Sequence, residues 1–298
     1  SLKDAVVLDA GVPRNRKAHH ANGLFTRDHT PPADLYKAAK NDLARYDSVS
    51  LVSAKVHSAK RGENNDFTLE VELLDSEEHV EYVAKRVILA NGVEDILPDI
   101  PGMKDLWGSH IWACPFCHGF EVANAHLGVL LTDHLPADMY PMMIRNWSRD
   151  LTVYSNGQEL AEDKIRFFKT ANIKLETRKI KSFAEADQNP DELLITLEDG
   201  TEEVLTGLFT HSDTHLDHAT GPKLWKELGC ELSEMGFIKV DEMQATTVPG
   251  VFAAGDPTHM RHAVVAAAHQ GYMAGASAVL SFVMESVKAA HAEGAEGK

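Results

Sequence analysis

Two cysteines, Cys114 and Cys117, lie two residues apart in the stretch WACPFCHGFE (112–121), and His118 follows the second directly. A pair spaced in this way is typical of a redox-active dithiol, of one half of a metal site, or of two packed thiols. The sequence holds one further cysteine and no second ligand pair, so zinc would need a fourth ligand such as His110. Metal binding is therefore the weakest of the three interpretations.

The third cysteine, Cys230, has no partner in the sequence and is expected to be a packed thiol. Sixteen histidines are many for 298 residues. His211, His215 and Asp217 lie in an expected crossover between domains, but no helical H-x-x-x-H pair with a third ligand accompanies them. The sequence predicts no metal site.

Composition narrows the class of protein. Three cysteines in 298 residues are too few for a disulfide framework, and we find no secretory signal, so a reducing, cytoplasmic compartment is expected. We find no apolar stretch near the roughly 18–20 residues that span a bilayer. A formal charge of −16 and a pI near 5.4 give no basic surface for nucleic acid or an anionic membrane.

Several elements must position the cysteines. Residues 3–11 (KDAVVLDAG) predict a buried strand that runs into a turn, and 33–46 has the apolar spacing of a helix. Three strands are expected next, in 48–61, 67–75 and 79–92, because these segments alternate or run apolar and are rich in β-branched residues.

The pattern restarts after the cysteines. A strand at 126–134, a helix around 139–147 and a second strand at 150–156 form a new βαβ unit. Further strands follow, with NPDE (189–192) as a turn signal, and a long Ala-rich helix is expected from about Ala263. Strands that alternate with helices, with one restart, predict an α/β protein with two dinucleotide-type domains.

The order of three segments resembles the low-molecular-weight thioredoxin reductases and, more closely, the fungal dithiol oxidases that close disulfides in gliotoxin-type metabolites. The segments are VILANGVEDILPDIPG (87–102), WACPFCHGFE (112–121) and VPGVFAAGD (248–256). They resemble the family's A-T-G-like turn, its active-site segment and its late flavin-binding strand, and the resemblance extends from Val6 to about Ser281.

This resemblance implies two Rossmann-like, three-layer domains. A discontinuous FAD-binding-like domain would comprise residues 1–121 and 217–298, with an inserted NADPH-domain-like region at 122–216. The family's pattern makes Cys117 the flavin-proximal thiol and Cys114 the interchange thiol, and it implies a homodimer.

The resemblance also assigns further site residues. Asp256 with Gly255, and Asn91 with Gly92, fall in the two flavin-binding segments. Asp9 follows the first strand, where these folds place an acid for the ribose hydroxyls; a turn-forming Asp before glycine is the alternative.

Histidines are the expected bases. His118 is adjacent to the dithiol, and the resemblance places the start of the last helix, with His262 and His269, beside the flavin ring. One of these two would accept the proton of the substrate thiol, since histidine titrates near neutral pH.

Two features depart from the family. The glycine-rich G-x-G-x-x-G turn, expected about thirty residues before 3–11, is absent from this sequence, which reads as N-terminally shortened and should weaken FAD binding. In the inserted domain, TDHLPADMY (132–140) replaces the second glycine-rich turn with Asp133 and Asp138, and carboxylates repel a pyrophosphate. NADPH is therefore not expected, whereas oxygen is expected as electron acceptor.

Two classes of function remain open. The first is an FAD-dependent dithiol oxidase that converts a small-molecule dithiol, of the epidithiodiketopiperazine type, to its disulfide. The alternative is a cofactor-free relative that acts as a non-redox isomerase or cyclase in secondary metabolism, or a pseudo-enzyme.

Overall fold

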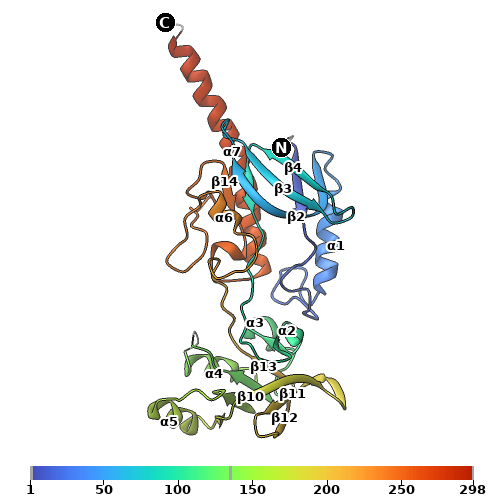
Figure 1. Ribbon diagram of the computed structural model, residues 1–298, viewed down its shortest axis with the longest axis vertical. Coiled ribbons are helices and arrows are strands. Elements are labelled where there is room, and N and C mark those ends of the chain that lie inside the picture. The colour runs from blue at the N-terminus through green and yellow to red at the C-terminus, as the bar shows by residue number, and fades with distance from the viewer. Residues whose placement is uncertain (1–2, 134–135, 297–298) are drawn as a thin grey trace. The chain divides into compact units, whose positions relative to one another are not determined.

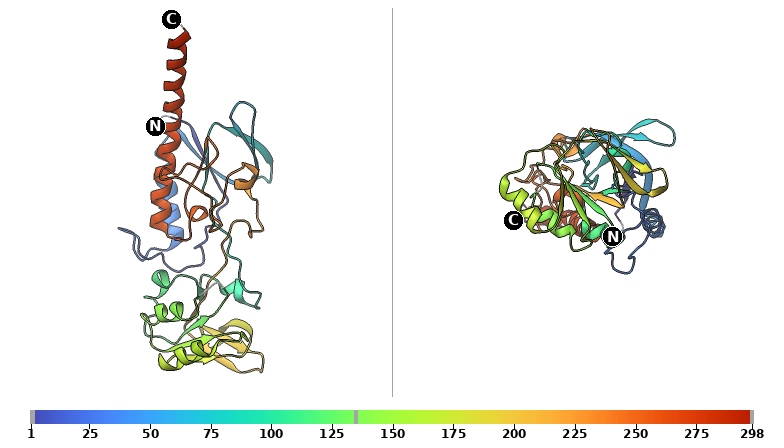
Figure 2. Two further views of the ribbon diagram at one scale, coloured as in Figure 1. Left: turned by 90° about the vertical axis from the view of Figure 1, so that its left-hand side faces the viewer. Right: turned by 90° about the horizontal axis from the view of Figure 1, so that it is seen from below.

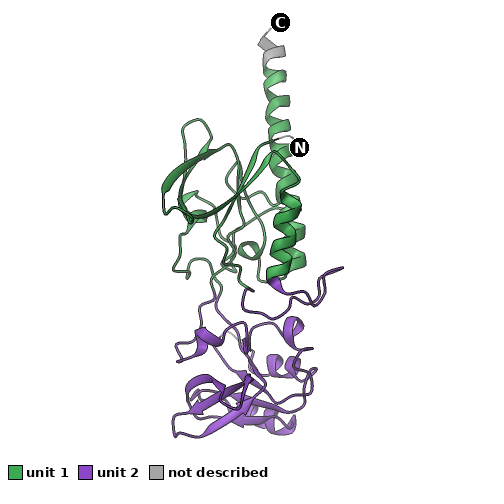
Figure 3. Ribbon diagram, turned by 90° about the vertical axis from the view of Figure 1, so that its right-hand side faces the viewer, with its two compact units in different colours: residues 1–14, 33–94, 214–298 green, residues 15–32, 95–213 purple. Residues whose placement is uncertain are grey.

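The computed structural model describes residues 3–133 and 136–296, which fold into two compact units (Figures 1 and 3). Unit 1 consists of the residues up to 14, residues 33–94 and the residues from 214 onwards, and unit 2 of residues 15–32 and 95–213. The boundaries expected from the sequence lie elsewhere, at 121/122 and 216/217. The assignment of the units to FAD-type and NADPH-type domains stays a prediction.

Unit 1 contains a four-stranded sheet in the order β1-β2-β3-β4. β1 (Ala5–Asp9) is parallel to β2 (Val49–Arg61), and β3 (Phe67–Leu73) and β4 (His79–Ala84) continue antiparallel. The helix α1 (Pro32–Leu43) joins β1 to β2, since two parallel strands need such a crossover. The helix expected at 33–46 is thus confirmed.

The core of unit 1 forms against this sheet. Phe67, Leu69 and Val71 alternate along β3 and are buried, which is the period-two pattern of a strand with one covered face. The short helix α6 (Leu224–Glu227) adds Leu224 to the same cluster.

β1 differs from its expected burial. The strand is present, but Val6 is 47% exposed and Val7 38% exposed. β1 is an edge strand that pairs with β2 on one side. The prediction of a buried strand was therefore wrong, because an apolar run indicates a strand but not what covers it.

The single strand expected at 79–92 is two strands in different sheets. β4 pairs with β3, whereas β5 (Val87–Leu89) pairs in parallel with β14 (Val251–Ala253). Between them, the guanidinium of Arg86 donates to Ser281 Oγ at 2.6 Å. This contact joins the segment between the two strands to the last helix.

The last helix, α7 (Val264–Glu296), follows the short 3₁₀ helix η1 (Asp256–Thr258) and runs without interruption (Figure 2). Its segment Val264–Ala292, with mean hydropathy 1.2, is long and apolar enough to cross a membrane by length and composition. No such stretch was expected from the sequence. One such helix is a weak indication of a membrane span, because core helices meet the same criterion.

Unit 2 is built on a five-stranded parallel sheet in the order β6-β13-β7-β8-β9. The strands are β6 (Ile111–Trp112), β13 (Gly207–Phe209), β7 (Leu127–Leu130), β8 (Leu151–Tyr154) and β9 (Lys174–Glu176). All residues of β7 and β8 are buried, as in parallel sheets covered on both faces.

Two helices follow strands of this sheet. α4 (Met139–Ile144) joins β7 to β8, and α5 (Glu162–Thr170) joins β8 to β9 and buries Phe168. The βαβ restart predicted from the sequence is present.

Unit 2 also contains a three-stranded antiparallel sheet of β10 (Ile180–Ala186), β11 (Asn189–Leu197) and β12 (Glu202–Leu205). The helix α2 (Met103–Leu106) shares its core. The turn expected at NPDE (189–192) lies two residues earlier, because Asn189 already pairs with Ala186 in the ladder.

Candidate active site

Cys114 and Cys117 form a disulfide, with an S–S distance of 2.11 Å. β6 ends at Trp112, and α3 (Pro115–His118) begins after Cys114, with proline at the first helical position, where its missing N–H costs nothing. The backbone N–H groups of Cys117 and His118 donate to Cys114 O at 3.2 and 3.3 Å. The dithiol therefore lies at the carboxyl end of an edge strand of the parallel sheet.

Glycine at position 119 is required by close packing. A Cβ atom there would lie 2.5 Å from Pro115 O and 2.6 Å from the ring of Trp147. The N–H of Gly119 also donates to Pro115 O at 2.8 Å. Any side chain at this position would displace the turn that carries the two cysteines.

His118 is held on two sides. Its ring stacks on Trp112, with 5.4 Å between ring centroids, and its Nδ1 lies 3.4 Å from Glu121 Oε2. Burial lowers the pKa of His118 below its ordinary value, although Glu121 acts in the opposite direction. Because a carboxylate can only accept, the proton of neutral His118 is on Nδ1 and the lone pair is on Nε2.

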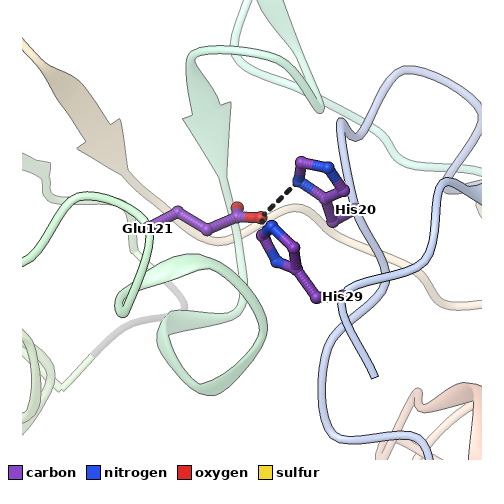
Figure 4. Close-up of side chains that lie close together, drawn as sticks. All are labelled: His20, His29 and Glu121. Carbon is purple, nitrogen blue, oxygen red and sulfur yellow. Dashed lines mark hydrogen bonds and ion pairs between the residues drawn. The ribbon is translucent and has the colours of Figure 1, made fainter. Parts of the chain in front are cut away.

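The other oxygen of Glu121 lies close to the loop of residues 15–32, which the sequence motifs do not include (Figure 4). Nδ1 of His20 lies 3.2 Å from Glu121 Oε1, and Nδ1 of His29 lies 4.0 Å from it. Asn22 Nδ2 donates to Glu121 Oε1 at 3.1 Å and to Cys117 O at 2.9 Å. Side chains of the loop 15–32 therefore contact both a side chain and a backbone carbonyl of the dithiol segment.

A shallow pocket of about 420 Å³ lies in the same loop. Leu24, Phe25 and Phe120 contribute its apolar lining, together with Asn22. Phe25 is 88% exposed and Phe120 is 80% exposed. Two exposed aromatic rings beside the dithiol segment give an apolar binding surface.

The residues assigned to the cofactor lie in unit 1, and the β5–β14 pair brings two of their segments together. Ala253 pairs with Leu89, and the N–H of Ala254 donates to Leu89 O at 3.0 Å. The carboxyl ends of the two strands therefore meet at one edge. Asn91 with Gly92 follows the first strand, and Gly255 with Asp256 follows the second.

Asp256 pairs with an arginine that sequence reasoning missed. Arg14 Nη1 lies 3.3 Å from Asp256 Oδ2 and 2.7 Å from His262 Nδ1. Since arginine can only donate, His262 Nδ1 is the acceptor in this contact. Asp256 is the first residue of η1, and Gly255 is its N-cap.

Asp9 and Asp256 both act on the same tyrosine, Tyr36. Burial and the negative charges of Asp9 and Asp256 raise the pKa of Tyr36. Burial opposes the ionisation of Asp9, but the Gly11 amide at 2.9 Å and Lys40 at 2.9 Å outweigh it and lower its pKa. The turn-forming role considered for Asp9 is thus present.

Gln270, rather than His269, contacts the Asp256 turn. The N–H of Gly255 donates to Gln270 Oε1 at 2.7 Å, and Gln270 is buried, whereas His269 is exposed on α7. Gly255 has φ 83° and ψ −154°, a conformation essentially restricted to glycine.

Cys230 is buried in the core of unit 1, and burial raises the pKa of its thiol. The packed thiol expected from the sequence is confirmed. His211 belongs to unit 2, whereas His215 and Asp217 belong to unit 1.

The start of α4 is occupied by the protein's own carboxylate. Asp138 accepts from the N–H of Met139 at 3.0 Å and from Lys164 Nζ at 2.6 Å, and the contact with Lys164 lowers the pKa of Asp138. Asp133 accepts from Gln158 Nε2 at 3.1 Å. In a dinucleotide fold this helix terminus receives the pyrophosphate.

Comparisons with known proteins agree with this architecture. A family model described as pyridine nucleotide-disulphide oxidoreductase matches residues 153–294. The chain is similar to "Thioredoxin reductase aclD" of Aspergillus oryzae, with 32% identity over 86% of this chain and 81% of that protein. It is also similar to "Thioredoxin reductase sirT" of Leptosphaeria maculans, with 31% identity over 92% and 85%.

Among solved structures, the chain resembles the crystal structure of HlmI. The TM-score is 0.85 and the identity 29%, and the match covers 99% of this chain and 89% of the other.

Proposed function

We propose that this chain, which belongs to the thioredoxin reductase family, closes the disulfide of a small-molecule dithiol of secondary metabolism through Cys114 and Cys117. Membership of this family makes the chain a thioredoxin reductase-like oxidoreductase. The substrate, the electron carrier and the oxygen acceptor are our proposal.

One observation carries the proposal. The Cys114–Cys117 disulfide is followed directly in the chain by His118, a partly buried histidine whose Nδ1 faces Glu121 and whose Nε2 offers a lone pair. Disulfide exchange requires a thiolate as attacking group, so a neutral base next to the disulfide suits a thiol substrate.

The exchange balances in two steps. One substrate thiolate attacks Cys114 Sγ, the Cys114–Cys117 bond breaks, and Cys117 leaves as a thiolate. The second substrate thiolate then attacks the substrate sulfur of the mixed disulfide, so that the substrate disulfide forms and Cys114 leaves. Two electrons pass to the cysteine pair. His118 Nε2 accepts one of the two thiol protons, and the leaving Cys114 thiolate takes up the other.

The pocket supports a small apolar substrate. Phe25 and Phe120 offer aromatic faces, and their neighbour Asn22 offers an amide beside Cys117 O. A dithiol diketopiperazine has this combination of a flat ring, amide groups and two thiols. A protein disulfide is a poorer match to a pocket of about 420 Å³.

FAD is the proposed electron carrier. The residues around Asp256 fit its sugar and phosphate groups: Asp9 and Asp256 are acceptors for hydroxyls, and Arg14 supplies a cation for phosphate. FAD would take the two electrons from the dithiol and pass them to oxygen. Within this chain, Arg14 and Gln270 hold the Asp256 turn in place.

NADPH is not proposed. The Asp138 carboxylate already occupies the start of α4, where a pyrophosphate would bind, and Asp133 adds a second negative charge nearby in the sequence. These contacts disfavour NADPH at this helix terminus, and oxygen is therefore the proposed partner in electron transfer.

A homodimer in the cytoplasm is the proposed assembly. Four apolar residues on α7 follow the spacing i, i+3, i+4, i+7 and are 47–53% exposed: Leu280, Val283, Met284 and Val287. Such a stripe is typical of helices that pack on a partner, here a second copy of the chain.

Visible absorption of the purified protein, with and without added FAD, tests the electron carrier. Bands near ~450 nm in the protein fraction support the proposal. A protein that stays colourless after incubation with FAD contradicts it, and product analysis with the Cys114→Ser, Cys117→Ser variant then distinguishes the non-redox alternative. Turnover that survives both substitutions would favour an isomerase or cyclase.

A further inference from the structure

We propose that His20, His29 and Glu121 form a binding site for a divalent transition cation of the Zn²⁺ class. One candidate ligand atom from each residue lies within 4.8 Å of the other two, and the three side chains converge on one point beside the dithiol segment (Figure 4). All three belong to unit 2. The inference does not rest on the proposed redox function, although the two share Glu121, whose second oxygen contacts His118.

The geometry suits tetrahedral coordination. The two imidazole rings are stacked with 3.7 Å between centroids and 20° between planes. His20 Nδ1 lies 3.2 Å from Glu121 Oε1, and His29 Nδ1 lies 4.0 Å from it. Ligands about 2.1 Å from a tetrahedral Zn²⁺ are about 3.4 Å apart, so the His20 contact already has this spacing and His29 Nδ1 would move about 0.6 Å closer to Glu121.

Polar contacts already hold the three side chains together. Glu121 Oε1 accepts from Asn22 Nδ2 at 3.1 Å and lies 3.2 Å from His20 Nδ1. His29 Nδ1 lies 3.3 Å from Asn22 Oδ1 and 4.0 Å from Glu121 Oε1. A bound cation would replace the proton between His20 Nδ1 and Glu121 Oε1, and His29 Nδ1 would leave Asn22 Oδ1 to become the third ligand.

The donor set selects the class of ion. Two imidazoles and one carboxylate are ligands of catalytic zinc sites, which keep a fourth position for water, and imidazole disfavours Mg²⁺ and Ca²⁺. The side chains of His20 and His29 are 32% and 61% exposed, so an ion has access from solvent.

Outer contacts connect the site to the dithiol segment. Asn22 donates to Glu121 Oε1 and to Cys117 O, and the second oxygen of Glu121 faces His118. Such outer partners orient the ligands of metal sites. Bound Zn²⁺ would therefore fasten the loop 15–32 to the turn that follows α3.

The test uses the full chain with its disulfide intact, freed of metal by a chelator and titrated with Zn²⁺ in a calorimeter. One Zn²⁺ per chain is expected. His29→Ala and Glu121→Gln should each weaken binding at least about 100-fold, because the loss of an outer partner alone costs 10- to 100-fold. The matched control is His126→Ala, since His126 contacts Val204 O and Thr152 Oγ1 elsewhere in unit 2.

X-ray absorption of the Zn²⁺-loaded wild-type chain needs no variant. Two imidazole ligands and oxygen ligands at about 2.0–2.1 Å are expected. Sulfur ligands, no binding of Zn²⁺, or binding that His29→Ala and His126→Ala leave equally strong would overturn the proposal. An unchanged affinity in the Cys114→Ser, Cys117→Ser variant is the further expected result, and loss of binding there would overturn it too.

Discussion

Glu121 Oε2 lies 3.4 Å from His118 Nδ1, so that one carboxylate fixes the orientation of the imidazole next to the disulfide. The contact places the proton of neutral His118 on Nδ1 and directs its lone pair to Nε2. A base with a defined tautomer is what the proposed thiol exchange needs.

Replacement of His118 should slow the exchange without abolishing it. His118→Asn removes the proton acceptor, and general base catalysis contributes about 10²- to 10⁴-fold, so a decrease of that size is expected. The measurement is the rate of disulfide product from a small dithiol, with metal-free protein. His126→Asn is the control, and an unchanged rate in His118→Asn would rule out the role of His118 as base.

The two cysteines should differ in the adducts they form. Cys117→Ser leaves Cys114 able to form a mixed disulfide that no second cysteine resolves, so a disulfide substrate should leave a stable adduct on this variant. Cys114→Ser should give little adduct if Cys114 is the interchange thiol. Intact-protein mass spectrometry reads both.

Cys230→Ser, combined with Cys117→Ser, is the control in the same assay. The wild-type Cys230 thiol is buried and its pKa is raised, so it holds less thiolate at neutral pH and should not form the adduct. Removal of Cys230 should therefore leave the adduct on Cys114 unchanged. Equal adducts on both single variants would contradict the assignment of Cys114.

Gly255 should tolerate no side chain. An added Cβ would lie 3.6 Å from Ala267 Cβ, an ordinary contact, so the cost of Gly255→Ala comes from φ 83° and ψ −154°. Strain of this kind costs about 1–3 kcal/mol of unfolding free energy. Gly271→Ala, in open space on α7, should instead stabilise the helix by about 0.5–1 kcal/mol. Denaturant unfolding of both variants checks the difference, and equal midpoints would contradict it.

Charges on the exposed stripe of α7 should break the proposed dimer. Leu280→Glu with Val287→Glu places two carboxylates on the apolar stripe, where burial of charge against a second copy is costly. Ala289→Glu, on the opposite side of the helix by the 100° rotation per residue, is the control. Light scattering with size-exclusion chromatography should report a monomer for the first variant only; a monomeric wild type would refute the dimer.

Much of the fold follows from local patterns. Alternation in β3 and the largely apolar runs of β7 and β8 predict strands correctly, because these patterns reflect the burial of the strands themselves. The exposure of β1 does not follow from its sequence, because it depends on which elements cover the strand. Likewise, the apparently single strand at 79–92 is divided because its second part pairs with β14, far along the chain.

Some residues of the candidate site can likewise be predicted from local sequence, and others cannot. Cys114, Cys117 and His118 are neighbours in the sequence, and their spacing alone predicts thiol chemistry. Arg14 and Asp256 are 242 residues apart, and no spacing rule connects them. His20 and Glu121 are separated by 101 residues. His19 and His20 are adjacent in the sequence, but a pair of histidines alone does not indicate a partner about a hundred residues away.

The most direct test of the proposed reaction is a single turnover without oxygen. Oxidised protein is mixed with one equivalent of a small dithiol diketopiperazine, and product and protein thiols are counted by mass spectrometry after alkylation. The account predicts one molecule of disulfide product per chain and no loss of the buried Cys230 thiol. The two electrons are expected on Cys114 and Cys117, both then alkylated, in protein freed of FAD, or on reduced flavin in protein that carries FAD. A substrate that stays reduced while the Cys114–Cys117 disulfide remains intact would contradict it.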